Sequence, residues 1–118
     1  MDKNLYHYKA KVTGVYDGDT CTMDIDLGLH TWIRGEKIRL HRINAPELKG
    51  KERNKGLASR DSLKSLILEK EVLIETIKDE KEKYGRYLSE IWLADSKGGY
   101  LNVNDWMVNN GFAKYQKY

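Results

Sequence analysis

The sequence predicts an α+β domain that is mainly β, and three observations support this fold class. An apolar–polar alternation near the N-terminus predicts a half-buried strand, apolar residues in the middle of the chain have helical spacing, and β-rich segments lie on both sides of them. With 118 residues, the chain can bury one core but not two. We therefore expect a single domain over residues 1–118, with its core at about 6–114 and one functional site.

The first two strands are expected on either side of a turn. Residues 6–15 mix aromatic and branched side chains with polar ones, and Tyr16-Asp17-Gly18-Asp19 has the composition of a turn. Beyond it, apolar residues at positions 21, 23, 25 and 27 alternate with polar ones, so the odd positions should face inward in a hairpin with the first strand. Asp19 has the same parity, which predicts a carboxylate at the mouth of the barrel that needs a cation or an Arg partner.

The rest of the chain is expected to place one helix between strands. A loop around residues 28–35 leads to a strand at about 37–43, which ends before Pro46. Apolar spacing predicts a helix over about 57–68, followed by strands at 72–77 and 87–93. Asn104 is expected to cap a short helix over about 105–110. The order β-β-β-α-β is that of a five-stranded OB-type β-barrel with one helix after strand 3 and a short C-terminal helix.

Composition narrows the classes of function. The net charge of +3 permits an anionic partner but does not show where the charges lie. The single cysteine, Cys21, excludes an internal disulfide and a cysteine cluster for zinc, and we expect it to be buried. The chain has no signal-peptide-like start and no segment long enough to span a bilayer, so we expect a cytoplasmic monomer without a membrane partner. Secretion from a longer precursor stays open.

Four segments together resemble the staphylococcal nuclease (thermonuclease) family. They follow the family's order and spacing, and the resemblance runs from about Tyr8 to Lys114. The segments are Val15-Tyr16-Asp17-Gly18-Asp19-Thr20, Ile38-Arg39-Leu40 through Asn44-Ala45-Pro46-Glu47, Lys83-Tyr84-Gly85-Arg86, and Leu101-Asn102-Val103-Asn104 through Gly111-Phe112-Ala113. The resemblance implies a calcium-dependent nuclease that hydrolyses DNA and RNA, preferably single-stranded, to products ending in 3′-phosphate.

The resemblance also implies a site for one Ca²⁺ ion. Asp19 supplies a hard carboxylate oxygen of the kind that Ca²⁺ prefers, and it is implied as a direct ligand with Asn44 and the backbone carbonyl of Ala45. The family usually has Asp at the position of Asn44. Because Asn keeps a carbonyl oxygen but removes one negative charge, we expect calcium to bind weakly.

Three side chains are implied to act on the phosphodiester. Glu47, which follows Pro46, is implied as the general base that activates the attacking water. Arg39 and Arg86 match two arginines that hold the scissile phosphate, because a planar fork of donors can bind two phosphate oxygens.

Further residues are expected to contact nucleic acid. Lys83 and Tyr84 lie beside Arg86 in the sequence and are expected at a neighbouring phosphate, and Tyr115 and Tyr118 are expected to stack on bases. The basic residues at positions 49, 51, 53 and 55 either contact the nucleic-acid backbone or form a solvated loop.

Two alternatives to the nuclease stay open. The first is a catalytically weak or inactive nuclease-like module that binds nucleic acid or another protein, and Asn44 is the one feature that favours it. The joint presence of Asp19, Arg39, Glu47 and Arg86 argues against this alternative. The second is an interaction domain that presents exposed tryptophans at positions 32, 92 or 106, although the last two are expected in the core.

Overall fold

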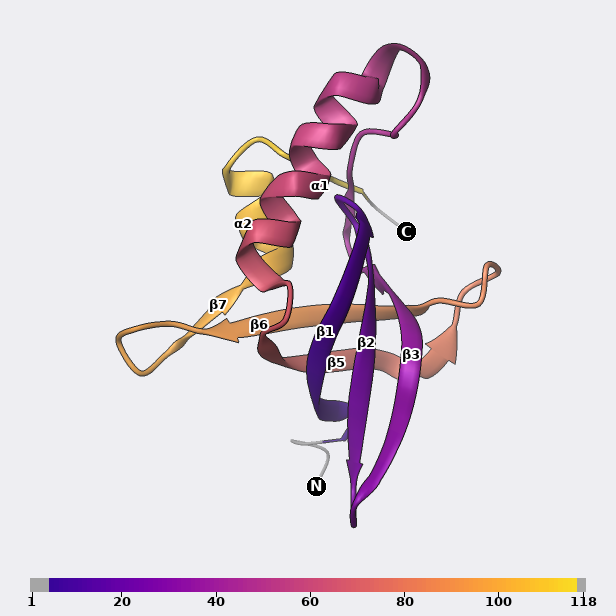
Figure 1. Cartoon of the computed structure of the whole chain (residues 1–118), viewed down its shortest axis with the longest axis vertical. Coiled ribbons are helices and arrows are strands. Elements are labelled where there is room, and N and C mark those ends of the chain that lie inside the picture. The colour runs from indigo at the N-terminus through magenta and orange to yellow at the C-terminus, as the bar shows by residue number, and fades with distance from the viewer. Residues whose placement is uncertain (1–4, 117–118) are drawn as a thin grey trace.

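The protein is a small closed barrel with both helices toward one end of it (Figure 1). The computed structural model describes residues 5–116. The barrel strands are β1 (His7–Asp17), β2 (Thr20–Gly28), β3 (Thr31–Leu40), β5 (Glu71–Lys81) and β6 (Tyr87–Ala94). The other elements are β4 (Ile43–Asn44), the short 3-10 helix η1 (Gly50–Glu52), α1 (Arg53–Ile67), β7 (Tyr100–Asn102), α2 (Val103–Asn109) and β8 (Lys114–Tyr115).

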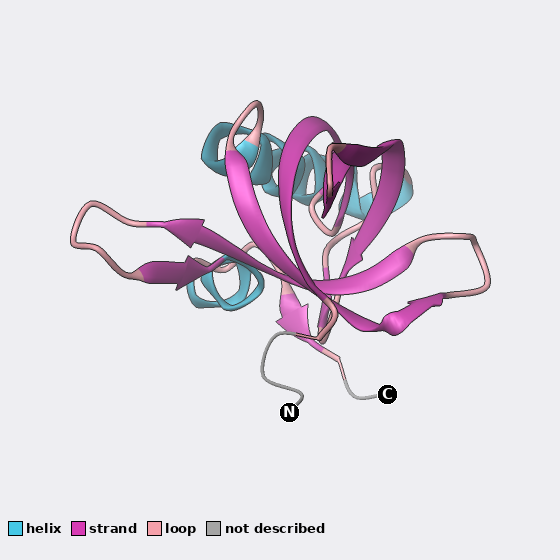
Figure 2. Cartoon of the chain, turned by 90° about the horizontal axis from the view of Figure 1, so that it is seen from below, coloured by secondary structure: helices cyan, strands magenta, loops and turns pink. Residues whose placement is uncertain are grey.

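The strand order confirms the predicted fold class. The sheet runs β3-β2-β1-β5-β6-β7, and its only parallel pairing among the described residues joins β3 to β6, with Ile38 opposite Tyr87. This pairing closes five strands into a barrel, whose curvature is visible in Figure 2. Strand β7 extends β6 into a hairpin that projects from the barrel (Figure 2). The fold is therefore α+β, mainly β, of the OB type.

The loop expected at residues 28–35 is instead a tight hairpin. Strands β2 and β3 pair up to Gly28 opposite Thr31, which leaves only Leu29 and His30 in the turn. Both residues have positive φ, at 53° and 63°, as a two-residue turn of type I′ requires. Such turns usually contain Asn-Gly, Asp-Gly or Gly-Gly, so the Leu-His pair gave no sequence signal.

The third strand also ends earlier than predicted. It stops at Leu40, because Arg42 adopts φ +70° and breaks the extended chain. The chain then resumes as β4, which pairs with β8 near the C-terminus, where Asn44 lies opposite Lys114. The strand expected at 72–77 continues to Lys81 through an irregularity in its pairing.

The helices differ from the prediction at their first residues. Helix α1 begins at Arg53 and not at 57, and α2 begins at Val103. The N-cap of α2 is Asn102, whose side chain accepts a hydrogen bond from the Asp105 N–H. Asn104 is fully buried and donates to the His41 and Ser89 carbonyls. Within residues 5–116, neither helix has the length and apolar character needed to cross a membrane.

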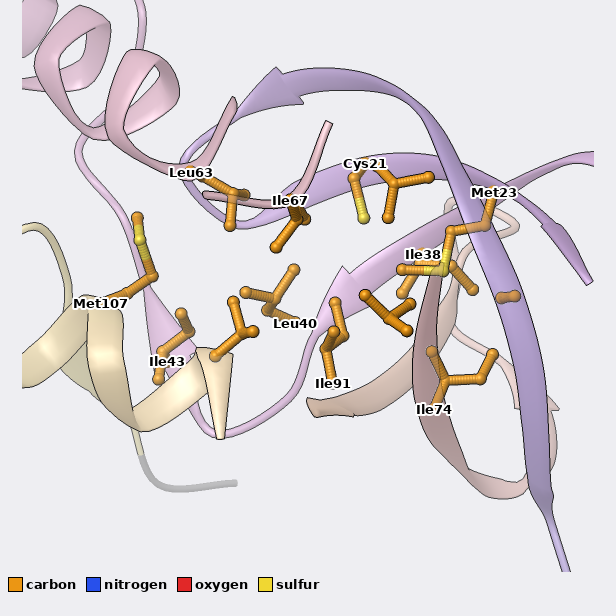
Figure 3. Close-up of a cluster of buried hydrophobic side chains, with 14 of the residues drawn as sticks. Cys21, Met23, Ile38, Leu40, Ile43, Leu63, Ile67, Ile74, Ile91 and Met107 are labelled. Atoms are coloured by element: carbon orange, nitrogen blue, oxygen red, sulfur yellow. The ribbon is translucent and has the colours of Figure 1, made fainter. Parts of the chain in front are cut away.

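The core lies between the barrel wall, α1 and α2 (Figure 3). The alternation in β2 predicted it in part, since Cys21, Met23 and Ile25 are at most 3% exposed. Leu27 was expected to face inward as well, but it is 43% exposed because β2 runs past the end of the core toward the hairpin. Helix α1 contributes Leu63 and Ile67, both fully buried.

Candidate functional site

One cavity of about 850 Å³ lies beside the turn that joins β1 to β2. Among the proposed site residues, Glu47, Tyr84 and Arg86 line it, together with Asp17 and Thr20. These side chains come from β1, β2, the segment after β4 and the loop between β5 and β6. Barrel closure therefore assembles the cavity from parts of the chain that are far apart in sequence.

The turn between β1 and β2 packs tightly against its surroundings. A Cβ atom on Gly18 would lie 2.7 Å from the Cβ atoms of both Ala45 and Ser59. Because any side chain at position 18 would separate these groups, glycine allows the turn to lie against the segment after β4 and against α1. This close approach places the neighbouring Asp19 beside Ala45.

Asp19 is buried, as its parity predicted, and it has the expected Arg partner. Its Oδ2 accepts a hydrogen bond from the Ala45 N–H at 2.8 Å and lies 3.4 Å from Nη2 of Arg39. Its Oδ1 accepts a hydrogen bond from the Thr20 hydroxyl at 3.2 Å. These partners stabilise a charge that would be costly to bury alone.

Arg39 is only 9% exposed, and most of its donors have partners inside the protein. Its Nη1 donates to the carbonyls of Leu40 and Ile43 at 2.7 and 2.9 Å. Its Nη2 lies 3.4 Å from Oδ1 of Asn44, the same distance as from Asp19. Arg39 therefore brings together two of the oxygens that were proposed to bind calcium.

Arg86 lies in the cavity wall and is held by Glu82. The Glu82 carboxylate accepts from Nε and Nη2 of Arg86 at 3.1 and 3.0 Å, and also from the backbone N–H groups of Tyr84 and Arg86. This pairing lowers the pKa of Glu82 to about 2 and raises that of Arg86. The remaining fork nitrogen, Nη1, donates to the Thr20 hydroxyl at 3.0 Å.

Thr20 therefore connects the two halves of the site. Its hydroxyl accepts from Arg86 and donates to Asp19, so a single oxygen separates the cavity arginine from the buried carboxylate. Thr20 itself is only 6% exposed. The sequence motif contained this residue, but no role was predicted for it.

Asp17 is a site residue whose role the sequence did not predict, because it was interpreted as part of the turn. It does stabilise the turn, since its Oδ1 accepts a hydrogen bond from the Asp19 N–H at 3.0 Å. It also lines the cavity. Burial raises its pKa to about 6, and repulsion from the Asp19 carboxylate adds to this rise. Negative charge is thus concentrated in this corner, where a bound cation would lower the pKa of Asp17.

Glu47 projects into the same cavity from an exposed position. Within the described part of the chain, no side chain pairs with its carboxylate, so the carboxylate is accessible to a water molecule. Its backbone is held by α1, since a Cβ atom on Gly56 would lie 2.1 Å from the Glu47 carbonyl oxygen. Gly56 in the first turns of the helix therefore lets the Glu47 segment pack directly on the helix backbone.

The residues expected to contact nucleic acid lie in different places. The Tyr84 ring is 69% exposed, and the charges of Lys83 and Arg86 lie 5.1 and 5.4 Å from its centre. Tyr115 does not line the cavity; its hydroxyl donates to Asp105 and its ring lies against Arg42. Tyr118 lies outside the described residues. Of the four basic residues at positions 49–55, only Lys49 lines the cavity.

The site contains oxygens of the kind that a hard cation binds, and Arg39 already lies against two of them. Asp19 and Asn44 contribute side-chain oxygens that converge on one nitrogen of Arg39. Within residues 5–116, no three His, Cys, Asp or Glu residues gather into a metal-binding group. This donor set suits Ca²⁺, which takes carboxylate, amide and carbonyl oxygens and fills its other positions with water. A transition metal would prefer nitrogen or sulfur ligands.

The fold and the cavity together define a nuclease-like barrel of the OB type. Residues 37–118 match the sequence family described as staphylococcal nuclease homologue, and the chain belongs to this family. The match begins within β3, so the turn with Asp17 and Asp19 lies outside the matched range and is placed by the structure in the same barrel. No curated protein sequence matches the chain.

Proposed function

We propose that the protein is a calcium-dependent nuclease that hydrolyses phosphodiester bonds in DNA and RNA. One observation carries the proposal: the Glu47 carboxylate and the Arg86 guanidinium line a single cavity, and Asp19 lies one hydroxyl group behind its wall. A base, a cation for the phosphate and a hard anionic oxygen are the groups that this hydrolysis needs.

Each residue has a defined task in the proposed reaction. Glu47 accepts a proton from a water molecule while the water oxygen attacks phosphorus. The bond from phosphorus to the 5′ oxygen breaks, and that oxygen takes a proton from solvent, which leaves a 3′-phosphate. Arg86 binds the phosphate oxygens as negative charge develops on them, and Glu82 keeps its guanidinium oriented. A bound Ca²⁺ ion would neutralise part of the phosphate charge, and Asp19, Asn44 and the Ala45 carbonyl would hold it.

Arg39 is proposed to contribute through Nη2. Its Nη1 is occupied by two backbone carbonyls, whereas Nη2 lies beside the Asp19 and Asn44 oxygens. A phosphate bound next to these oxygens would also be within reach of Nη2. In this arrangement Arg39 would have a single nitrogen for the phosphate. Arg86, whose three nitrogens already have partners on Glu82 and Thr20, would contribute the second N–H groups of Nη1 and Nη2.

The test is cleavage of denatured DNA over a calcium titration, with EDTA as the metal-free control. We expect cleavage only with calcium, near-complete loss of turnover in Glu47→Gln, and wild-type turnover in the matched control Glu71→Gln, whose exposed carboxylate lies outside the cavity. Asn44→Asp restores a negative ligand and should lower the calcium concentration needed for half-maximal activity. Unchanged activity in Glu47→Gln would refute its assignment as the base.

A second candidate is a module of the same fold that binds nucleic acid without cleaving it. Asn44 favours this candidate, because the site lacks one of the negative charges that usually hold calcium. A binding module should slow the migration of single-stranded DNA in a gel to the same extent with calcium and with EDTA, and it should leave the DNA uncut. Cleavage gained only in Asn44→Asp would identify the substitution as the cause.

A further inference from the structure

Tyr16 is placed in the cavity wall by a β-bulge. Between β1 and β2, Val15 pairs with Cys21 and Asp17 pairs with Thr20, so Tyr16 is an extra residue without a partner on β2. Bulges of this kind redirect a side chain and often occur beside active sites. Here the bulged residue is 68% exposed and lines the cavity that contains Glu47 and Arg86.

The cavity extends past the proposed reaction centre along β2 and β3. Two residues beyond Thr20 and its partner Arg39, Thr22 pairs with Lys37, and both line the cavity. On its other side Thr22 pairs with Gly14, which has no side chain to fill the space over β1. This part of the wall therefore combines an exposed aromatic ring, a hydroxyl group and a cation.

We propose that Tyr16 and Lys37 form a second subsite, which binds the nucleotide next to the scissile phosphate. The Tyr16 ring stacks on its base, and the Lys37 ammonium pairs with its phosphate. The subsite rests on the proposed nucleic-acid substrate and gives a physical reason for a preference for single strands. A base within a duplex is already stacked on both faces, whereas an unpaired base can stack on Tyr16.

The cavity's charges favour this occupant over an apolar one. The carboxylates of Asp17 and Glu47 lie at the reaction centre, whereas Lys37 and Lys49 provide positive charge along the wall. The Tyr84 ring, which lines the same cavity from the loop between β5 and β6, is already approached by two cations. Tyr16 makes no such contact among the described residues, so its ring faces are available to a base.

The test is equilibrium binding of a short labelled oligothymidylate and of an abasic oligomer of the same length, in EDTA so that the probes are not cleaved. Tyr16→Ala should weaken binding of the oligothymidylate by roughly 5- to 100-fold and reduce its advantage over the abasic oligomer. Tyr16→Phe, which keeps the ring, should bind like the wild type. Lys37→Ala should weaken both probes and lower the slope of log affinity against log salt by about 0.7.

Tyr100→Ala is the matched control, because Tyr100 is also an exposed tyrosine but lies on β7, away from the cavity. Equal losses in Tyr16→Ala and Tyr100→Ala, or no loss in Tyr16→Ala, would overturn the subsite. A wild type that binds neither probe would overturn it as well. Cleavage with calcium is measured in parallel. Binding that depends on Tyr16, without cleavage, would support the subsite and refute the nuclease. Cleavage together with intact binding in Tyr16→Ala would support the nuclease and refute the subsite.

Discussion

Glu82 should stabilise the folded protein through the loop that carries Arg86. Its carboxylate accepts two hydrogen bonds from the guanidinium and two from backbone N–H groups, and the two side chains are only 17% and 21% exposed. The pKa of Glu82 falls from 4.5 to about 2, which at 1.36 kcal/mol per unit sets an upper limit of about 3 kcal/mol. Because solvent screens a partly exposed pair, we expect Glu82→Gln to cost about 1–2 kcal/mol.

The dependence of this loss on pH distinguishes the ion pair from simple packing. A carboxylate whose pKa is lowered by folding contributes fully above its unfolded pKa, and the contribution disappears as pH falls through the folded pKa. For Glu82 this window runs from about 4.5 down to about 2. The difference in unfolding free energy between wild type and Glu82→Gln should therefore be largest at pH 7 and less than half as large at pH 3.

Urea denaturation at several pH values measures this difference directly, and thermal melts should show a lower Tm by about 4–8 °C at pH 7. Glu80→Gln is the matched control, since Glu80 is exposed near the end of β5, just before the loop with Glu82, and should change stability by less than about 0.5 kcal/mol. A difference that stays constant from pH 7 to pH 3 would show that the ion pair is not the cause.

Three further outcomes follow from the structure. In an ordinary helix, Gly56→Ala would increase the free energy of unfolding by about 1 kcal/mol. Here it should lower that free energy by about 1–3 kcal/mol and reduce turnover, because the new Cβ atom would clash with the Glu47 carbonyl. Equal or higher stability in urea would contradict the close approach. Asn104→Ala removes the side chain that bonds to the Ile91 N–H and the His41 carbonyl, and it should lower the free energy of unfolding by about 3 kcal/mol or more. The loss should appear as a lower urea midpoint, and a loss below about 1 kcal/mol would contradict this role. Calcium at millimolar concentration should raise the Tm of the wild type slightly and that of Asn44→Asp by more, and equal shifts would refute Asn44 as a ligand.

The sequence predicted the local parts of the fold better than the contacts between them. The alternation in β2 and the turn composition before it were sufficient for the first hairpin, because both signals are local. The turn at Leu29 and His30 was missed since its positive φ angles occur without the usual glycine or asparagine. Asn104 was expected to cap a helix, but its side chain bonds to groups on β6 and before β4, which are distant in sequence.

The candidate site, like the fold, was predicted better from local motifs than from contacts between distant residues. The motifs placed Asp19, Glu47 and Arg86 in one site. The structure brings Glu47 and Arg86 to one cavity and places Asp19 behind its wall, connected through Thr20. The positions of Asp17 and Tyr16 in the cavity wall were not predicted, because they depend on a bulge and on burial that no local pattern reveals. The position of Tyr115 was not predicted either: its hydroxyl is bound to Asp105 and is not directed to the cavity.

The parallel pairing of β3 with β6 has a consequence for folding kinetics. It joins Ile38 to Tyr87 across the intervening helix and β5, so the chain must close a long loop before this pairing contributes any stability. The bond between Thr20 and Arg86 joins the same two sides of the barrel. An intermediate that has formed only the first hairpin and α1 would therefore lack the assembled cavity. We expect ligand binding to be regained during refolding together with barrel closure, later than the helical signal.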